Sequence, residues 1–117
     1  LRMERQEVFE ATHARVLQWL QDGHLDALRI DHPDGLSDPQ QYFHRLQSRH
    51  AHQAEIAGRE PRALYLVVEK ILAEHEPLSH LWPVHGDTGY RFGTLVNGLF
   101  VDTRQVAATA KVVALPA

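Results

Sequence analysis

The apolar residues near the start of the chain follow a helical period. Between Glu4 and Gln21 they recur every three or four positions, which predicts an amphipathic helix. Gly23 follows the last periodic residue and is a typical helix stop. The predicted buried side of this helix and its flanks comprise Val8, Phe9, Thr12, Val16, Trp19 and Leu20.

Two short apolar runs farther along the chain predict β-strands. The run Leu25–Ile30 ends at Asp31 and is followed by the turn-forming sequence Pro33-Asp34-Gly35. The run Ala63–Val68 is continuous and rich in valine and leucine, as in strands that are covered on both faces.

A helix is predicted between these two strands. Asp38 can cap the free amides, Pro39 suits the first helical position, and Gln41 can close a capping box. The helix is expected to run to near Ile56, with Gly58 as its stop. The middle of the chain is therefore one βαβ unit, whose parallel strands end at the same edge of the sheet.

The segment after Leu72 has no sustained period. Residues 74–84 contain two prolines and read as a loop, and residues 86–90 read as turns. Residues 92–100 are apolar enough for a short helix or for irregular packing, and Thr103–Leu115 could form a last helix. The expected fold class is α/β: a helix, a βαβ unit and a long irregular C-terminal segment.

Composition and charge narrow the functional classes. The chain has 117 residues, of which 44% are apolar and 23% charged, as in ordinary globular domains. Its net charge of −3 predicts neither a nucleic-acid partner nor a membrane partner. It has no cysteine and no apolar run long enough to span a bilayer. No secretory signal is visible, so a cytoplasmic location is expected.

A carboxylate follows each predicted strand. Asp31 and Glu69 would meet at one edge of the sheet, where neighbouring strands are about 4.8 Å apart. Retaining glycosidases place a nucleophile and an acid/base about 5–5.5 Å apart. Arg29 leaves its strand on the same side as Asp31 and is expected to keep it ionised. The pKa of Glu69 is expected to be raised by desolvation and by the charge of Asp31, as a general acid requires.

These residues also have structural interpretations. An aspartate after a strand is most often a turn former or a helix cap. A Glu–Lys pair at a strand end is most often a solvated rim, and Lys70 is expected to point to the opposite side from Glu69. The nine histidines match no zinc-binding spacing and lack cysteine partners, which favours surface positions over a metal site.

Four sequence strings, in the same order, resemble the maltooligosyl trehalose synthase family within the α-amylase superfamily, glycoside hydrolase family 13. They are Arg29–Leu36, Val67–Leu72, Trp82–Tyr90 and Val96–Asp102. The resemblance implies a (β/α)8 barrel, of which the chain carries the fourth and fifth strands. It also implies that the reducing-end α-1,4 linkage of a maltooligosaccharide becomes an α,α-1,1 (trehalose) linkage. That reaction is a retaining intramolecular transglucosylation, for which no cofactor and no metal are expected.

The resemblance assigns roles to the matching residues. Asp31 is implied as the nucleophile, Glu69 as the acid/base and Arg29 as the support of the nucleophile. The candidate substrate contacts are His32, Asp34, Lys70, Trp82 and Tyr90. The rings of Trp82 and Tyr90 could stack on a glucose ring, because aromatic faces suit the apolar faces of sugars. Three of these have alternatives: a backbone hydrogen bond for His32, a turn for Asp34, and core or loop packing for Trp82.

Two hypotheses about the chain remain open. Residues 1–117 are either a segment of a catalytic barrel, with 103–117 as a divergent or non-native end, or a catalytically inactive structural piece. A whole barrel needs ~250 residues, and the third catalytic carboxylate of the superfamily is absent. A two-strand piece would leave both strand edges and Leu66–Val68 facing water, which favours a homodimer through exposed edges. An unrelated small α/β binding module would require the four strings to match by coincidence.

Overall fold

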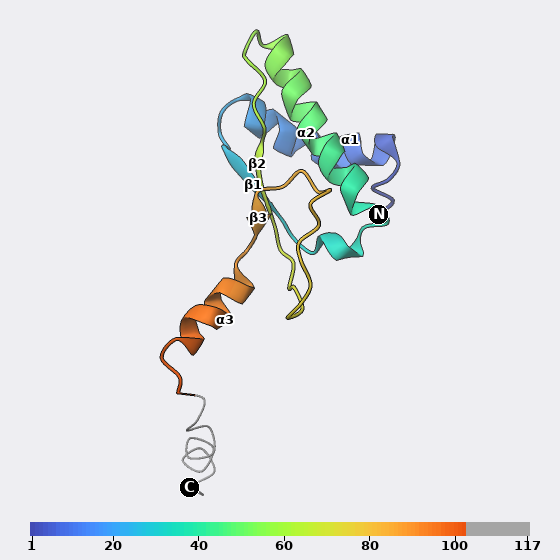
Figure 1. Cartoon of the computed structure of the whole chain (residues 1–117). Coiled ribbons are helices and arrows are strands. Elements are labelled where there is room, and N and C mark those ends of the chain that lie inside the picture. The colour runs from blue at the N-terminus through green and yellow to red at the C-terminus, as the bar shows by residue number, and fades with distance from the viewer. Residues whose placement is uncertain (103–117) are drawn as a thin grey trace, which may run out of the picture.

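The sheet consists of three parallel strands in the order β1–β2–β3, in a computed structural model that describes residues 1–102 (Figure 1). β1 spans Ala27–Ile30, β2 spans Tyr65–Val68 and β3 spans Gly86–Asp87. In the register of β1 and β2, Leu28 lies beside Leu66. The parallel pair with a helix between its strands confirms the predicted βαβ unit.

Three α-helices accompany the sheet within residues 1–102. α1 spans Gln6–Gln21, α2 spans Pro39–Ile56 and α3 spans Tyr90–Gly98. A short 3-10 turn at Pro33–Gly35 links β1 to α2. The fold class is therefore α/β, as the hydrophobic pattern predicts, and residues 90–98 adopt the helical alternative. The other predicted helix, at 103–115, lies outside the described residues.

Both long helices end at a glycine in the left-handed conformation. Gly23 follows α1 with a φ of 73°, and Gly58 follows α2 with a φ of 66°. After α1, the amides of Gly23 and His24 donate to carbonyls of the last helical turn, at 3.3 and 2.9 Å. The same pair of hydrogen bonds closes α2, so both ends are Schellman motifs and both predicted stops are confirmed.

The start of α2 is capped as its sequence predicts. Asp38 Oδ1 accepts a hydrogen bond of 2.8 Å from the Gln41 amide, and Pro39 occupies the first helical position. The second half of the expected capping box is different. The Gln41 side chain accepts from Arg45 Nη2 at 3.2 Å.

α1 and α2 both cover the same face of the sheet, and the core lies between them and β2. Its buried members are Phe9, Leu17 and Leu20 of α1, Tyr42, Phe43 and Leu46 of α2, and Leu64, Leu66 and Val68. Trp19 was expected in the core but is 43% exposed, because Leu17 occupies the inward position of that turn. β2 was expected to be covered on both faces, yet Tyr65 is 54% exposed and only one face is covered.

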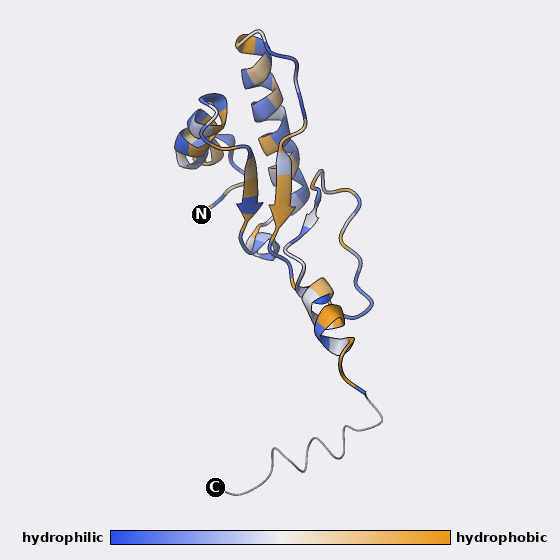
Figure 2. Ribbon diagram, turned by 90° about the vertical axis from the view of Figure 1, so that its left-hand side faces the viewer, coloured by the Kyte–Doolittle hydropathy of each residue, from blue (hydrophilic) through white to orange (hydrophobic). Residues whose placement is uncertain are grey.

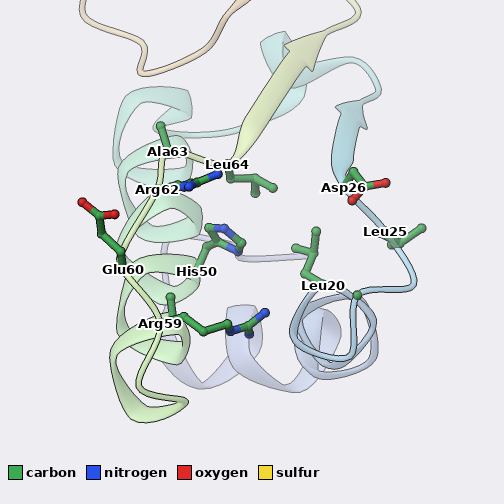
Figure 3. Close-up of a pocket in the computed structure, with 11 residues that line it drawn as sticks. Leu20, Leu25, Asp26, His50, Arg59, Glu60, Arg62, Ala63 and Leu64 are labelled. Atoms are coloured by element: carbon green, nitrogen blue, oxygen red, sulfur yellow. The ribbon is translucent and has the colours of Figure 1, made fainter.

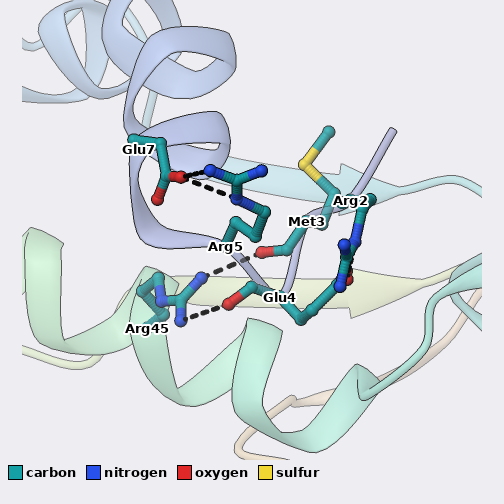
Figure 4. Close-up of polar contacts among 6 residues, drawn as sticks. All are labelled: Arg2, Met3, Glu4, Arg5, Glu7 and Arg45. Carbon is teal, nitrogen blue, oxygen red and sulfur yellow. Dashed lines mark hydrogen bonds and ion pairs between the residues drawn. The ribbon is translucent and has the colours of Figure 1, made fainter.

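The segment before α1 is fastened to α2 by one arginine (Figure 4). Arg45 Nη1 donates to the Met3 carbonyl at 2.9 Å, and Arg45 Nη2 donates to the Glu4 carbonyl at 3.1 Å. The same guanidinium lies 5.3 Å from the centre of the Phe9 ring, within cation–π range. The first residues of the chain are therefore packed against the two-helix layer.

β3 is the element that the sequence pattern does not predict. The flanking residue His85 donates its amide to the Leu66 carbonyl at 2.7 Å, and its ring Nδ1 accepts from the Leu66 amide at 3.2 Å. Gln47 of α2 adds bonds of 3.0 and 2.9 Å to the carbonyls of Leu64 and Pro83. β2 is therefore the central strand of the sheet. The expectation that the edges of β2 and the side chain of Leu66 face water is wrong.

α3 projects away from the sheet and its helices (Figures 1 and 2). Phe92 is 70% exposed and Leu95 is 64% exposed, and the apolar positions appear orange along this helix in Figure 2. None of the helices within residues 1–102 combines the length and apolar character needed to cross a membrane.

Candidate active site

The backbone places Asp31 and Glu69 next to each other beyond the strand ends. Ile30 pairs with Val68 in the parallel register, and the Glu69 amide donates to the Ile30 carbonyl at 2.7 Å. This bond extends the ladder by one step, so that Asp31 and Glu69 follow neighbouring strands at the same edge. The predicted meeting of the two carboxylate-bearing positions is confirmed.

Arg29 connects the two carboxylates. Its Nη1 lies 3.1 Å from Asp31 Oδ1, and its Nη2 lies 3.1 Å from Glu69 Oε1. The three residues occupy alternate positions of β1 and β2 on the face away from α1 and α2, because side chains alternate along a strand. One guanidinium thus pairs with both carboxylates and holds them toward each other, as its planar fork allows.

Tyr90, the first residue of α3, also binds Glu69. Its hydroxyl donates to Glu69 Oε1 at 2.8 Å. The turn before α3 aims it there: the Thr88 amide donates to the Val68 carbonyl at 3.0 Å, and Gly89 has a φ of 81°. Gly89 is suited to this left-handed position because it has no Cβ. Asp87 Oδ1 accepts from the Gly89 amide at 2.5 Å and closes the turn.

The pKa of Glu69 is lowered, and the expected increase is wrong for this chain. The largest cause is the hydrogen bond that Glu69 shares with the Asp31 carboxyl group, followed by the one that it accepts from the Tyr90 hydroxyl. The charge of Arg29 and a hydrogen bond from the His32 backbone act in the same direction. Burial of the Glu69 side chain, which is 24% exposed, acts in the opposite direction, and the other four causes together outweigh it.

Tyr90 shows the other side of the same hydrogen bond. Its pKa is raised, first because its proton is held by Glu69 and second because the Glu69 charge disfavours a phenolate. Tyr90 therefore stays a hydrogen-bond donor to Glu69. The pair couples α3 to the end of β2.

His32 follows Asp31 in an unusual backbone conformation. Its φ of 44° makes it the non-glycine residue with a left-handed backbone in the described part of the chain. Its carbonyl accepts from the Gly35 amide at 3.2 Å, and a Cβ on Gly35 would lie 3.0 Å from the His32 ring. Strained backbone of this kind is concentrated at functional sites. Its predicted contact with a sugar stays a prediction.

Lys70 and Asp34 bind each other. Lys70 Nζ lies 3.0 Å from Asp34 Oδ1 and 2.8 Å from Glu76 Oε1, and its side chain is only 13% exposed. Hydrogen bonds to Glu76 and Asp34 raise the pKa of Lys70. The two ion pairs tie the β1–α2 turn to the segment after β2. Within residues 1–102, the partners of Lys70 are Asp34 and Glu76 rather than Glu69 or Asp31, so Lys70 belongs to a different polar group. A role in substrate binding stays a prediction for Lys70 and Asp34.

Trp82 contributes to packing rather than to the carboxylate cluster. Its ring lies 5.1 Å from that of Phe43, and it packs against the buried core. The packing alternative for this residue therefore has direct support. Stacking of Trp82 on a glucose ring stays a prediction.

The turn between β3 and α3 contains polar residues whose importance the sequence did not reveal. Asp87 shapes the turn, and the buried Thr88 Oγ1 has no hydrogen-bond partner within residues 1–102. The sequence analysis places the run Gly86-Asp87-Thr88-Gly89-Tyr90 in turns and names Tyr90 as a candidate substrate contact, but it gives Asp87 and Thr88 no role. What it lacked was any indication that β3 would carry these residues to the end of β2.

A hollow of about 620 Å³ lies at the opposite end of the sheet (Figure 3). His50, Arg59 and Arg62 project into it, and Glu60 points away. Burial and the nearby charge of Arg59 lower the pKa of His50. None of the carboxylate cluster lines this hollow, so it is separate from the site described above.

Histidine, aspartate and glutamate side chains do not gather as a metal-binding group of three in the described range 1–102. The groups that meet at the strand ends are two carboxylates, a guanidinium and a phenol. Two carboxylates at the ends of adjacent parallel strands, bridged by one arginine, resemble the carboxyl pair of a retaining glycosidase.

Comparisons with known proteins agree with this arrangement. No protein-family model matches the chain. Putative maltooligosyl trehalose synthases from two strains of Mycobacterium tuberculosis are 44% identical to it over 87% of its length. The structure of maltooligosyltrehalose synthase from Arthrobacter ramosus matches 87% of the chain with 37% identity and a TM-score of 0.71. A glycosyltrehalose synthase matches 88% of the chain with 36% identity and a TM-score of 0.71.

The matched part is a small share of each relative. The chain spans 12% of the length of the curated proteins and 12% of the Arthrobacter ramosus structure. High identity and the same fold over nearly nine-tenths of this chain show common descent rather than a chance likeness. The chain is therefore homologous to one segment of the maltooligosyl trehalose synthases.

Proposed function

We propose that the chain is the part of a maltooligosyl trehalose synthase that carries the nucleophile and the acid/base. In this proposal it supplies the fourth and fifth strands of a (β/α)8 barrel of glycoside hydrolase family 13. The observation that carries the proposal is the Arg29 bridge, with 3.1 Å to both Asp31 and Glu69 at the ends of neighbouring parallel strands. The names of the relatives supply the substrate class, maltooligosaccharides, and the trehalose product.

In the first proposed step, the Asp31 carboxylate attacks the anomeric carbon of the penultimate glucose. The C1–O4 bond breaks, and Glu69 gives its proton to O4 of the terminal glucose. The result is a covalent glycosyl ester on Asp31 and a bound glucose. The Asp31 side chain is 73% exposed, so it is accessible to such a substrate.

In the second proposed step, the released glucose turns over and presents its own anomeric hydroxyl. Glu69 accepts the hydroxyl proton while the oxygen attacks the ester-bound anomeric carbon. Asp31 leaves as a carboxylate, Glu69 is again protonated, and the product ends in an α,α-1,1 linkage. Two displacements at the same carbon retain its configuration.

An inactive structural role is the second candidate. The outer edge of β1 is unpaired in the described structure, and Phe92 and Leu95 of α3 are exposed. These surfaces would suit a homodimer formed through the β1 edge. Incubating the 117-residue chain with maltopentaose separates the two candidates. Formation of a non-reducing product by this chain would refute the inactive alternative.

The proposed catalytic roles are tested in the intact protein that contains this segment. We expect it to convert maltopentaose to a non-reducing product, measured as loss of reducing ends and by chromatography. Asp31→Asn and Glu69→Gln should each lower turnover by about 10²–10⁴-fold, the usual range for acid/base catalysis. Asp22→Asn and Glu60→Gln are matched controls outside the cluster. Turnover within a few-fold of wild type in Asp31→Asn or Glu69→Gln would refute the assignment.

A further inference from the structure

Two donors converge on one oxygen of Glu69. Tyr90 Oη is 2.8 Å from Oε1, and Arg29 Nη2 is 3.1 Å from the same atom. Arg29 uses its other terminal nitrogen for Asp31 and is therefore shared between the carboxylates. Tyr90 donates its hydroxyl proton to Glu69, and the Arg29 guanidinium also interacts with the phenol oxygen.

The two oxygens of Glu69 are thus in different environments. A carboxyl group that transfers a proton carries it on one oxygen, and an oxygen that already accepts two donors is a poor place for a proton. Oε1 is the accepting oxygen here. The Asp31 carboxyl and the His32 backbone also hydrogen-bond Glu69. Because Oε1 already accepts from Tyr90 and Arg29, Oε2 is the atom better able to hold the transferable proton.

We propose that Tyr90 is a positioning residue for the acid/base: its hydroxyl holds Oε1 of Glu69 so that Oε2 carries the proton that is transferred. This inference rests on the acid/base role proposed for Glu69. It differs from the expectation that Tyr90 stacks on a sugar, because it assigns the function to the hydroxyl rather than to the ring.

The backbone around Tyr90 supports a fixed position for this hydroxyl. The Gly89 amide is bound by Asp87, the Thr88 amide continues the pairing with β2, and Tyr90 then begins α3. These two hydrogen bonds therefore hold the turn that leads to Tyr90 next to β2, the strand that precedes Glu69. The phenol of Tyr90 joins the start of α3 to the residue that follows β2.

The hydrogen bond has a consequence for proton donation. The Tyr90 hydroxyl stabilises the carboxylate form and helps to lower the pKa of Glu69. Loss of the hydroxyl should therefore raise the pKa of Glu69. A general acid works only when protonated, so activity falls as pH rises through its pKa. Removal of the hydroxyl should move this alkaline limb to higher pH.

Tyr90→Phe is the variant that isolates the hydroxyl, because the ring is retained. Tyr65→Phe is the matched control: Tyr65 is also on the open face, is 54% exposed and packs its ring against His85 rather than against the carboxylates. In the intact protein, we expect Tyr90→Phe to lower kcat about threefold to tenfold, with little change in KM. The alkaline limb of its pH profile should move to higher pH, and Tyr65→Phe should match wild type.

Two kinetic outcomes would overturn the inference. The first is an alkaline limb of the pH profile that stays at the same pH in Tyr90→Phe, whatever the change in kcat. A merely structural role of Tyr90 would lower activity without moving this limb. The other is an unchanged Tyr90→Phe together with a large increase of KM in Tyr90→Leu. That pattern would assign the residue to sugar stacking by its ring.

A substrate-free measurement separates this inference from the proposed function. The ionisation of Glu69 can be followed by carboxyl ¹³C NMR in wild type, Tyr90→Phe and Tyr65→Phe. We expect the pKa of Glu69 to rise in Tyr90→Phe only. An unchanged pKa refutes the inference even in an active enzyme. A raised pKa of Glu69 in Tyr90→Phe, in a protein that forms no trehalose linkage, would support the contact between Tyr90 and Glu69. It would refute the proposed function, and with it the catalytic purpose assigned to Tyr90.

Discussion

The two faces of the sheet carry different kinds of residue. Leu66 and Val68 point toward α1 and α2 and are fully buried, whereas Tyr65 on the opposite face is 54% exposed. The open face continues into Arg29 and Glu69, which bind each other. Successive residues of a strand alternate between faces, so packing and chemistry are encoded by interleaved positions of the same two short segments.

This comparison explains how a small unit can hold a polar cluster in place. The helix-covered face determines the position of the strands, because its apolar side chains interlock with Phe43 and Leu46. The hydrogen bond from the Glu69 amide to the Ile30 carbonyl then extends the ordered backbone beyond the strand ends. The covered face thus fixes the position of the carboxylate cluster, and the open face leaves the cluster accessible.

The largest expected effect comes from truncating neighbours on opposite faces of β2. Leu66→Ala should lower the free energy of unfolding by about 2–5 kcal/mol, because it leaves a cavity in the core. Val67→Ala should cost about 1 kcal/mol or less, since Val67 is only half-buried on the open face. Urea unfolding followed by circular dichroism measures both. Equal losses would show that the two faces contribute equally.

A second pair compares arginines of the two faces. Arg29→Met should lower turnover of the intact protein about 10²-fold, as expected when a charged donor at a reacting centre is lost. Arg49 on α2 pairs with Glu10 of α1 instead, so Arg49→Met should leave turnover intact. Arg49→Met should lower the free energy of unfolding by about 0.2–1 kcal/mol, as for other exposed ion pairs. Maltopentaose kinetics and urea melts on the same samples test this, and a large loss of turnover in Arg49→Met would contradict it.

A smaller effect concerns the helix that connects the strands. Asp38→Ala removes the acceptor of the Gln41 amide and should cost about 1 kcal/mol of stability. Ser37→Ala, one residue earlier and exposed, is the control and should change little. Thermal unfolding of the two variants is compared. Because this cap belongs to a helix on the covered face, Asp38→Ala should leave the pKa of Glu69 unchanged.

The smallest expected effect is a pH dependence of the covered face. The pKa of His13 is lowered from its ordinary value of 6.5, mainly by burial, and its Nε2 lies 2.8 Å from Tyr42 Oη. The carbonyl of Phe9 can only accept, so Nδ1 carries a proton, and in the neutral ring that the lowered pKa favours, Nε2 accepts from the Tyr42 hydroxyl. The unfolded chain binds a proton more readily, so stability is full above pH 6.5 and decreases as pH falls toward the lowered pKa.

The His13 prediction is measured by urea unfolding at a series of pH values on either side of 6.5. His13→Ala should weaken the pH dependence in this window and leave the part due to His50, whose pKa is also lowered. The exposed His52→Ala should behave like wild type. A wild-type protein whose stability increases on acidification would contradict the stated sign.

Much of the fold could be predicted from short-range patterns. Helical periodicity, the Asp38 cap and the glycines at 23 and 58 locate α1 and α2 because each is a local signal. The alternation of side chains places Arg29, Asp31 and Glu69 together once the strands are parallel. The candidate carboxylate cluster therefore follows from the strand ends and one topological rule.

What could not be predicted depends on contacts between distant segments. β3 has only two residues and forms because Gln47 and His85 bind the backbone around it. The lowered pKa of Glu69 depends on Tyr90, twenty-one positions later, which the pattern does not bring near. Desolvation was expected to dominate because β2 looked covered on both faces, and one face is open.

The central claim is that Asp31 is the nucleophile and Glu69 its acid/base partner. The most direct measurement uses Glu69→Gln in the intact protein with α-maltotriosyl fluoride, because fluoride leaves without a proton donor. The account predicts that the glycosyl ester accumulates and that mass spectrometry finds the added sugar on the peptide containing Asp31. A label on a different carboxylate, or no label while Glu69→Gln still turns over maltopentaose, would contradict it.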